Sequence, residues 1–174
     1  MNIFVLDRDP IVAAQYHCDK HVPKMVVELY QQLGSAVRRH GATDSMMPLT
    51  KAGKPLKGGY PNHPCTRWVG ETRGNYLWTI DHAIALTKEF EFRFKKKHFC
   101  ADGIRTLANR RMRDLVPVGL MTPFAQAMPD QYKNGMHPVE AYRFYYAQDK
   151  QFNGMSFEYK RGREEPHWLT WYTL

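Results

Sequence analysis

The stretch that decides the fold is CDKHVPKMVVELYQQLGSAVRRHG, residues 18–41. Its apolar residues recur at helical spacing, which predicts one amphipathic helix whose apolar stripe packs on a partner. The stripe comprises Val22, Met25, Val26, Leu29, Leu33, Ala36 and Val37. Asp19 is the expected N-cap, and Gly41 follows the basic end of the helix.

The other face of this predicted helix is polar. It consists of His21, Lys24, Glu28, Gln32, Ser35 and Arg39. Glu28 therefore stands in mid-helix among basic and amide neighbours. Two interpretations are open: a solvated face joined by weak charge pairs, or a basic ligand-binding face that keeps one carboxylate for chemistry.

The composition points to an anionic partner. The 174 residues include 25 Lys and Arg against 17 Asp and Glu, a net charge of +8. Such a balance suits nucleic acid, and we expect double-stranded DNA as the partner of a monomer. The length predicts one domain, residues 1–174.

The cysteines and the apolar runs bear on location. Cys18, Cys65 and Cys100 lie far apart and form no CxxC, which predicts free thiols in a reducing cytoplasm. The chain shows no signal sequence and no apolar run of membrane-spanning length, so we expect no membrane partner. If the gene is phage-encoded, the place is the cytoplasm of the infected host cell.

Local patterns outline the remaining elements. In order, we expect an extended or strand segment at residues 3–6, a short helix from Asp9-Pro10, a basic surface loop at residues 42–62, a short helix from His63-Pro64, a long central helix at residues 75–97 with lysines in its last turn, a basic helix at residues 101–115, a loop at residues 116–133, a long helix from His137-Pro138, and a docked aromatic tail at residues 162–174. The fold class is therefore mainly α: a single compact domain of about three long helices with long basic loops.

Common chemical motifs are missing. The sequence has no glycine-rich phosphate loop, no GxGxxG and no GxSxG elbow. His17 and His21 have the spacing of two metal ligands on one helix face, with Cys18 between them, but nothing completes the set. We expect no metal and no cofactor.

Three runs in the first long helix occur in a distinctive order: Asp19-Lys20-His21-Val22, Val27-Glu28-Leu29, and GSAVRRH at residues 34–40. They resemble the first helix of the phage pyrimidine-dimer DNA glycosylases (endonuclease V type). More thinly, Asn62-His63-Pro64 is similar to the proline after that family's basic loop, and Pro166-His167-Trp168 to its Pro-x-Trp tail.

The resemblance implies an enzyme of base excision repair that kinks duplex DNA, extrudes a base and acts as an N-glycosylase, with or without AP-lyase activity. Glu28 matches the family's catalytic glutamate and His21 its histidine; Met1 or Asn2 would carry the nucleophilic N-terminal amine. By face and charge, we assign DNA phosphate contacts to Lys24, Arg38, Arg39, Lys51, Lys54, Lys57, Arg67 and Arg73.

The sequence also departs from the family. Asn2 is too large a second residue for removal of Met1 to be expected, which displaces the amine by one residue. Val27 and Ile3 stand where the family has arginines. Beside the amine route, three hypotheses are therefore open: a glycosylase in which Glu28 activates water, an enzyme similar to the amino-acid:DNA transferases of thymine hypermodification, and an inactive DNA-binding module.

Overall fold

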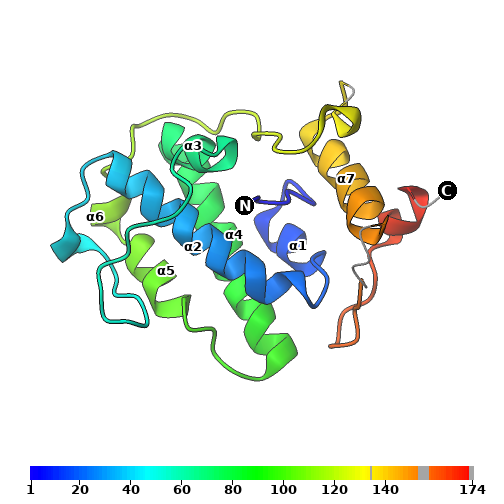
Figure 1. Cartoon of the computed structure of the whole chain (residues 1–174), viewed down its shortest axis with the longest axis horizontal. Helices are drawn as coiled ribbons and strands as arrows, with labels where there is room; N and C mark the ends of the chain where they lie inside the picture. Colours follow the sequence, from blue (N-terminus) through cyan, green and yellow to red (C-terminus); the bar gives the residue numbers. More distant parts are fainter. Residues whose placement is uncertain (134, 153–156, 173–174) are drawn as a thin grey trace.

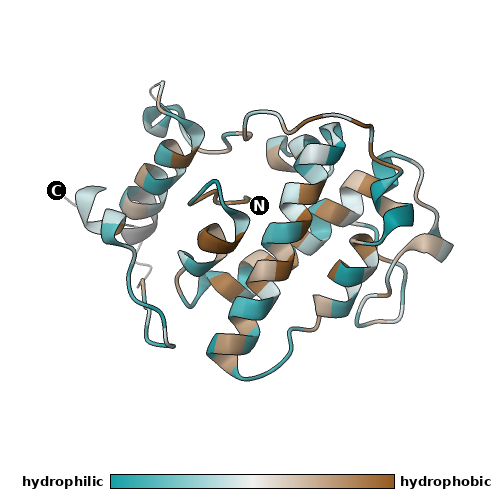
Figure 2. Cartoon of the chain, turned by 180° about the vertical axis from the view of Figure 1, so that it is seen from behind, coloured by the Kyte–Doolittle hydropathy of each residue, from teal (hydrophilic) through white to brown (hydrophobic). Residues whose placement is uncertain are grey.

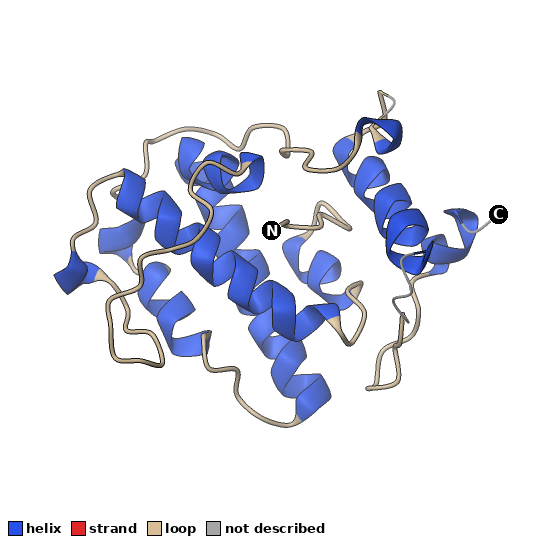
Figure 3. Ribbon diagram, viewed as in Figure 1, coloured by secondary structure: helices blue, strands red, loops and turns tan. Residues whose placement is uncertain are grey.

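The computed structural model describes residues 1–133, 135–152 and 157–172. Helices and connecting loops make up this part of the chain, which contains no β-strand (Figure 3). The elements are α1 (Pro10–Gln15), α2 (His21–Arg39), η1 (Asp44–Met46), α3 (Pro64–Glu71), α4 (Arg73–Phe94), α5 (Ala101–Leu107), α6 (Arg110–Arg113), η2 (Asp130–Tyr132), α7 (Pro138–Phe152) and η3 (His167–Tyr172). The mainly α fold with three long helices is confirmed. None of the described helices combines the length and apolarity needed to cross a membrane.

Helix α4 is central, as its apolar residues on two faces predict. It packs against α1, α2, α3 and α5 (Figure 1). Hydrophobic and hydrophilic residues alternate along the helix (Figure 2), whose exposed side carries Asp81, Lys88 and Glu91. The helix begins after Thr72, whose side chain accepts a hydrogen bond from the Asn75 N–H. Its predicted extension through Lys97 is wrong, because Lys95 adopts a left-handed conformation (φ 57°) that ends the helix.

Helix α2 buries its predicted stripe, and Gly41 follows its end with a positive φ of 91°. One prediction about this helix is wrong. Asp19 is not its N-cap: Lys20 occupies that position, and the Asp19 carboxylate binds Arg93 instead. Of the two interpretations left open for the polar face, a wholly solvated face does not hold, because His21, Gln32 and Ser35 are buried while Lys24 and Arg39 are exposed. Other parts of the chain cover the buried part of this face.

The N-terminal segment is the first of these covers. Ile3, Val5 and Leu6 are fully buried but pair with no strand, so the segment is extended chain laid in the core. The short helix α1 follows as predicted, with Asp9 as its N-cap accepting from the N–H groups of the next turn. The predicted helix at residues 101–115 is split in two by Asn109, which caps α6.

The C-terminal part completes the fold. Helix α7 begins at Pro138 as predicted, and η3 packs against it (Figure 1). Trp168 is buried with its ring 5.3 Å from the Arg143 guanidinium, so the aromatic tail docks at this point. Arg143 also donates to the Leu6 carbonyl (2.7 Å), which ties α7 to the N-terminal segment.

Two histidines lie buried between α1 and α4. His17 and His82 have ring centroids 5.6 Å apart, and each bonds a backbone carbonyl through Nδ1. Burial lowers the pKa of His17 well below its usual value and lowers that of His82 to about 4; charge from His82 and His21 adds to the effect on His17. Both imidazoles are therefore neutral in the folded protein near pH 7.

This pair should make the protein sensitive to acid. Because the folded-state pKa of His82 lies near 4 and the unfolded value near 6.5, the unfolded chain binds more protons below pH 6.5. The stability that depends on the neutral histidines is fully present above about pH 6.5. Protonation of His82 alone should lower the free energy of unfolding by about 3 kcal/mol between pH 7 and pH 4. Urea unfolding against pH measures the slope. His82→Gln should flatten it, whereas the exposed-site control His167→Gln should not; equal slopes in all three proteins would contradict the assignment.

Candidate active site

Glu28 lies against the N-terminus of the chain. Its Oε2 accepts a hydrogen bond from the Asn2 backbone N–H at 2.8 Å, and the Met1 amine is 3.8 Å from the same oxygen. Its Oε1 lies 3.5 Å from Lys24 Nζ. The Glu28 side chain is 12 % exposed, so solvent reaches it only in part. The mid-helix carboxylate of Glu28 is thus held between two cationic groups, the Lys24 side chain and the N-terminal amine of Met1.

Asn2 fixes this end of the chain. Its Oδ1 accepts from the N–H groups of Ile3 and Phe4, at 2.7 and 3.1 Å, and its Nδ2 donates to the Ala127 carbonyl at 2.9 Å. From α2, Gln32 Nε2 donates to the Asn2 carbonyl at 2.8 Å. Residue 2 is therefore held on three sides, and its backbone nitrogen is left to face Glu28.

Met1 belongs to the same arrangement. Its side chain is 2 % exposed, and Gln32 Nε2 donates to its Sδ at 3.2 Å. The residue as a whole is partly exposed, so the exposed portion is the main chain that carries the amine. The amine is thus presented at the surface beside Glu28 while the Met1 side chain anchors it.

His63 joins the site from the start of α3. Its Nδ1 accepts from the Cys65 N–H at 3.2 Å, which makes it the N-cap of that helix. Burial and then the charge of the Met1 amine lower the pKa of His63, and Glu28 opposes both. A neutral imidazole therefore lies within electrostatic reach of both groups.

Two residues of this site were not predicted from the sequence. Gln32 lies on the polar face whose interpretation the sequence leaves open, and the structure buries it fully against Met1 and Asn2. The sequence places His63 at the start of a short helix and in a run similar to a family motif, but does not point to it as a site residue. The available signal was histidine at a position where serine, threonine, aspartate or asparagine normally caps a helix.

His21 does not join Glu28. It is buried, its Nδ1 lies 2.7 Å from the Tyr146 hydroxyl, and its ring stacks on Phe4 at 5.4 Å. The two residues share a helix face but are seven positions apart, about 10 Å along the axis. The prediction that His21 serves the same site is therefore wrong; its place is in the aromatic core between α2 and α7.

The eight predicted phosphate-binding residues divide into two groups. Arg38 donates to the carbonyls of Ala42 and Leu56 and pairs with Asp44, and Arg73 pairs with Asp114 at 3.2 Å. We therefore assign these two half-buried arginines to the fold rather than to DNA. The others are exposed: Lys24 beside Glu28, Arg39 bonded to the Pro61 carbonyl, Lys51 over the Phe99 ring, Lys57 paired with Asp44, and Lys54 and Arg67.

Arg39 and Lys57 border a hollow of about 660 Å³ between the end of α2 and residues 57–62. A second hollow, of about 330 Å³, lies on another side of α2, lined by Val27, Phe99 and Lys51.

Positions 3 and 27 are those at which the resembling family has arginines. Here Ile3 is buried, and Val27 is partly buried and packs against the core.

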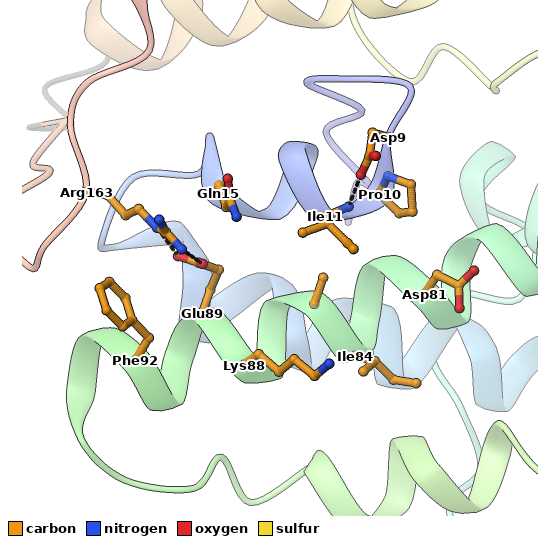
Figure 4. A pocket seen from close by; sticks show the side chains of 11 residues that line it. Asp9, Pro10, Ile11, Gln15, Asp81, Ile84, Lys88, Glu89, Phe92 and Arg163 are labelled. Atoms are coloured by element: carbon orange, nitrogen blue, oxygen red, sulfur yellow. Dashed lines mark hydrogen bonds and ion pairs between the residues drawn. The ribbon is translucent and has the colours of Figure 1, made fainter.

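A separate groove of about 480 Å³ runs between α1 and α4 (Figure 4). Ile11 and Phe92 lie along it, the Glu89–Arg163 ion pair closes one end, and Asp81 stands at the other. Glu28 is not among its lining residues, so this groove is distinct from the amine–carboxylate site.

Within the described ranges, no group of three or more His, Cys, Asp or Glu side chains is arranged to hold a metal ion. The three cysteines are buried and free. Burial raises the pKa of the Cys65 thiol to about 11, so the cysteine nearest the site is protonated near pH 7.

Comparisons with family models, with curated proteins and with solved structures find no match for this chain.

Proposed function

We propose that the protein is a DNA N-glycosylase that acts on an extruded pyrimidine and uses the N-terminal amine and Glu28 together. The observation that supports this most is the position of Glu28 Oε2, 2.8 Å from the nitrogen of residue 2 and 3.8 Å from the Met1 amine. An amine nucleophile needs a nearby group to orient it and take up charge, and a carboxylate at this distance does both.

The chemistry follows from this pairing. The amine lone pair attacks C1′ of the sugar, the N-glycosidic bond breaks, and its electron pair leaves with the base, which takes up a proton. Positive charge develops on the sugar as the bond breaks, and the Glu28 carboxylate stabilises it. Before the attack, the amine must lose its own proton, which the neutral His63 imidazole or Glu28 accepts and passes on to the departing base, so that Glu28 is ionised as charge develops on the sugar. The resulting amine–sugar adduct becomes an imine when the sugar ring opens.

Exposed cations supply the binding surface in this proposal. Lys24 lies next to Glu28, and Arg67 lies one helical turn beyond His63. Arg39 and Lys57 border the 660 Å³ hollow. Extruding a base costs a few kcal/mol, which phosphate contacts offset.

The decisive experiment incubates the protein with duplexes bearing a thymine dimer, an abasic site or a 5-modified pyrimidine, with and without borohydride. A borohydride-trapped protein–DNA adduct supports the amine route. Free base without trapping identifies water as the nucleophile, and a mass gain on an intact nucleotide identifies a transferase. DNA binding with none of these products leaves a binding module and overturns the proposal. Mass spectrometry of the trapped N-terminal peptide shows whether Met1 or Asn2 carries the amine.

DNA binding should weaken steeply with salt, with a slope of log K against log salt of about −0.9 per phosphate contacted. Lys24→Gln and Lys57→Gln should each reduce the magnitude of that slope by about 1. Lys88→Gln, in the α1–α4 groove, is the matched control and should leave the slope unchanged. Fluorescence anisotropy at several salt concentrations measures all four proteins; a slope near zero for the unmodified protein would exclude this surface as the DNA site.

A further inference from the structure

Tyr60 combines two unusual features. Its backbone has a φ of 49°, in the left-handed region that favours glycine, and the residue is 66 % exposed. A non-glycine residue keeps this conformation only where its surroundings enforce it, and such residues cluster at functional sites. Because the Tyr60 ring is exposed to solvent, the strained backbone does not contribute to the packing of the core.

Contacts on both sides of Tyr60 enforce the strain. The Gly59 N–H donates to Ser35 Oγ at 2.8 Å and to the Gln31 carbonyl at 3.3 Å, which fastens the loop to α2. On the other side, the His63 N–H donates to the Tyr60 carbonyl at 3.0 Å. At Gly58 (φ 87°), a Cβ would lie 2.3 Å from Ser35 Oγ, so only glycine permits this close approach.

The same contacts place Tyr60 beside the candidate active site. Gln31 lies about one helical turn beyond Glu28, and the His63 imidazole responds to the charges of both Glu28 and the Met1 amine. Tyr60 also lines the 660 Å³ hollow that Arg39 and Lys57 border. An exposed aromatic ring thus lines the hollow that the cations border, on a loop fastened to α2 within about one helical turn of Glu28.

We propose that Tyr60 stacks on the bases of duplex DNA and occupies the gap that the extruded pyrimidine leaves. This inference rests on the proposed function and assigns to Tyr60 the role of filling the gap in the base stack. Base–aromatic stacking is sequence-tolerant, because every base has a π-face, and side chains that enter a base step help to unstack it. The left-handed backbone is held by the contacts on both sides of Tyr60, and the ring is largely exposed to solvent.

The test uses a duplex with a tetrahydrofuran abasic analogue opposite 2-aminopurine, which offers a ready-made gap. Tyr60→Ala should weaken binding about 5- to 150-fold and reduce the change in 2-aminopurine emission on binding. Tyr60→Phe keeps the ring and should bind within twofold of the unmodified protein. Trp171→Ala removes an aromatic of similar exposure (62 %) on η3 and should change neither quantity.

Tyr60→Gly separates stacking from a structural role. Glycine adopts positive φ without strain, so this variant should melt no lower than the unmodified protein. It should nevertheless bind the duplex with the abasic analogue as weakly as Tyr60→Ala does. A lower melting temperature would show that the ring serves the fold. If the unmodified protein binds this duplex and also releases base from a duplex with a damaged pyrimidine, and Tyr60→Ala does both equally well, only the Tyr60 inference fails. If the unmodified protein binds no duplex, the proposed function fails and the inference with it.

Discussion

Glu28→Gln should slow base release by about 10²- to 10⁴-fold while DNA binding survives. The amide has the shape of the carboxylate but carries no charge, so it can neither stabilise the developing sugar cation nor accept a proton from the amine. A positioned acid–base group typically contributes 10²- to 10⁴-fold, and we expect a loss of about that size in single-turnover rate. Removing a negative charge beside the duplex should leave affinity unchanged or slightly tighter.

The control for this prediction is Glu91→Gln, at an exposed carboxylate on α4. It should change neither rate nor affinity. Melting temperatures of both variants should stay close to that of the unmodified protein, because the Glu28–Lys24 pair is largely exposed on the lysine side and such pairs contribute little. A Glu28→Gln protein that still releases base at the normal rate would remove Glu28 from the mechanism.

Arg93→Met should cause the largest loss of stability. The Arg93 side chain is 0 % exposed and donates to the carboxylates of Asp19 and Glu89, at 3.1 and 3.0 Å. It also donates to the carbonyls of His17 and Gln15, at 2.7 and 2.8 Å. Removing one partner of a buried ion pair leaves an uncompensated charge, and we expect the free energy of unfolding to fall by about 3–5 kcal/mol.

Arg93→Lys tests whether charge alone suffices. One ammonium group cannot reach two carboxylates and two carbonyls at once, so lysine should recover only a minor part of the loss. The control is Arg110→Ala, whose side chain is 88 % exposed and which pairs with Asp114 at 3.4 Å; it should cost no more than about 1 kcal/mol. Urea unfolding compares the proteins, and similar losses in Arg93→Met and Arg110→Ala would contradict the argument.

The Arg93 network also shows which contacts a sequence pattern does not encode. Glu89 and Arg93 have the spacing of a common surface pair, and the sequence offers no sign that Arg163 and Asp19 meet them. Residues 158–163 cover the network from a distant part of the chain, where the Lys160 N–H donates to Asp19 Oδ2 at 2.9 Å. Helical spacing alone therefore does not show that these charged residues are buried.

The same limit applies to the candidate site. Glu28 was singled out correctly as a mid-helix acid among cations, but its partners were expected to be water and DNA. Its closest contact in the structure is instead the Asn2 N–H. His21 was placed at the site because helical spacing gives a shared face, which does not reveal that Phe4 and Tyr146 cover one end of that face.

The sequence by itself determined the helical fold, the buried stripe of α2 and the central position of α4, because helical periodicity and capping are local properties of neighbouring residues. Only the tertiary structure decided which polar residues are buried and which meet. The site joins the N-terminus, the middle of α2 and the start of α3, segments that are far apart along the chain. Long-range packing brings them together, and no local pattern encodes that packing.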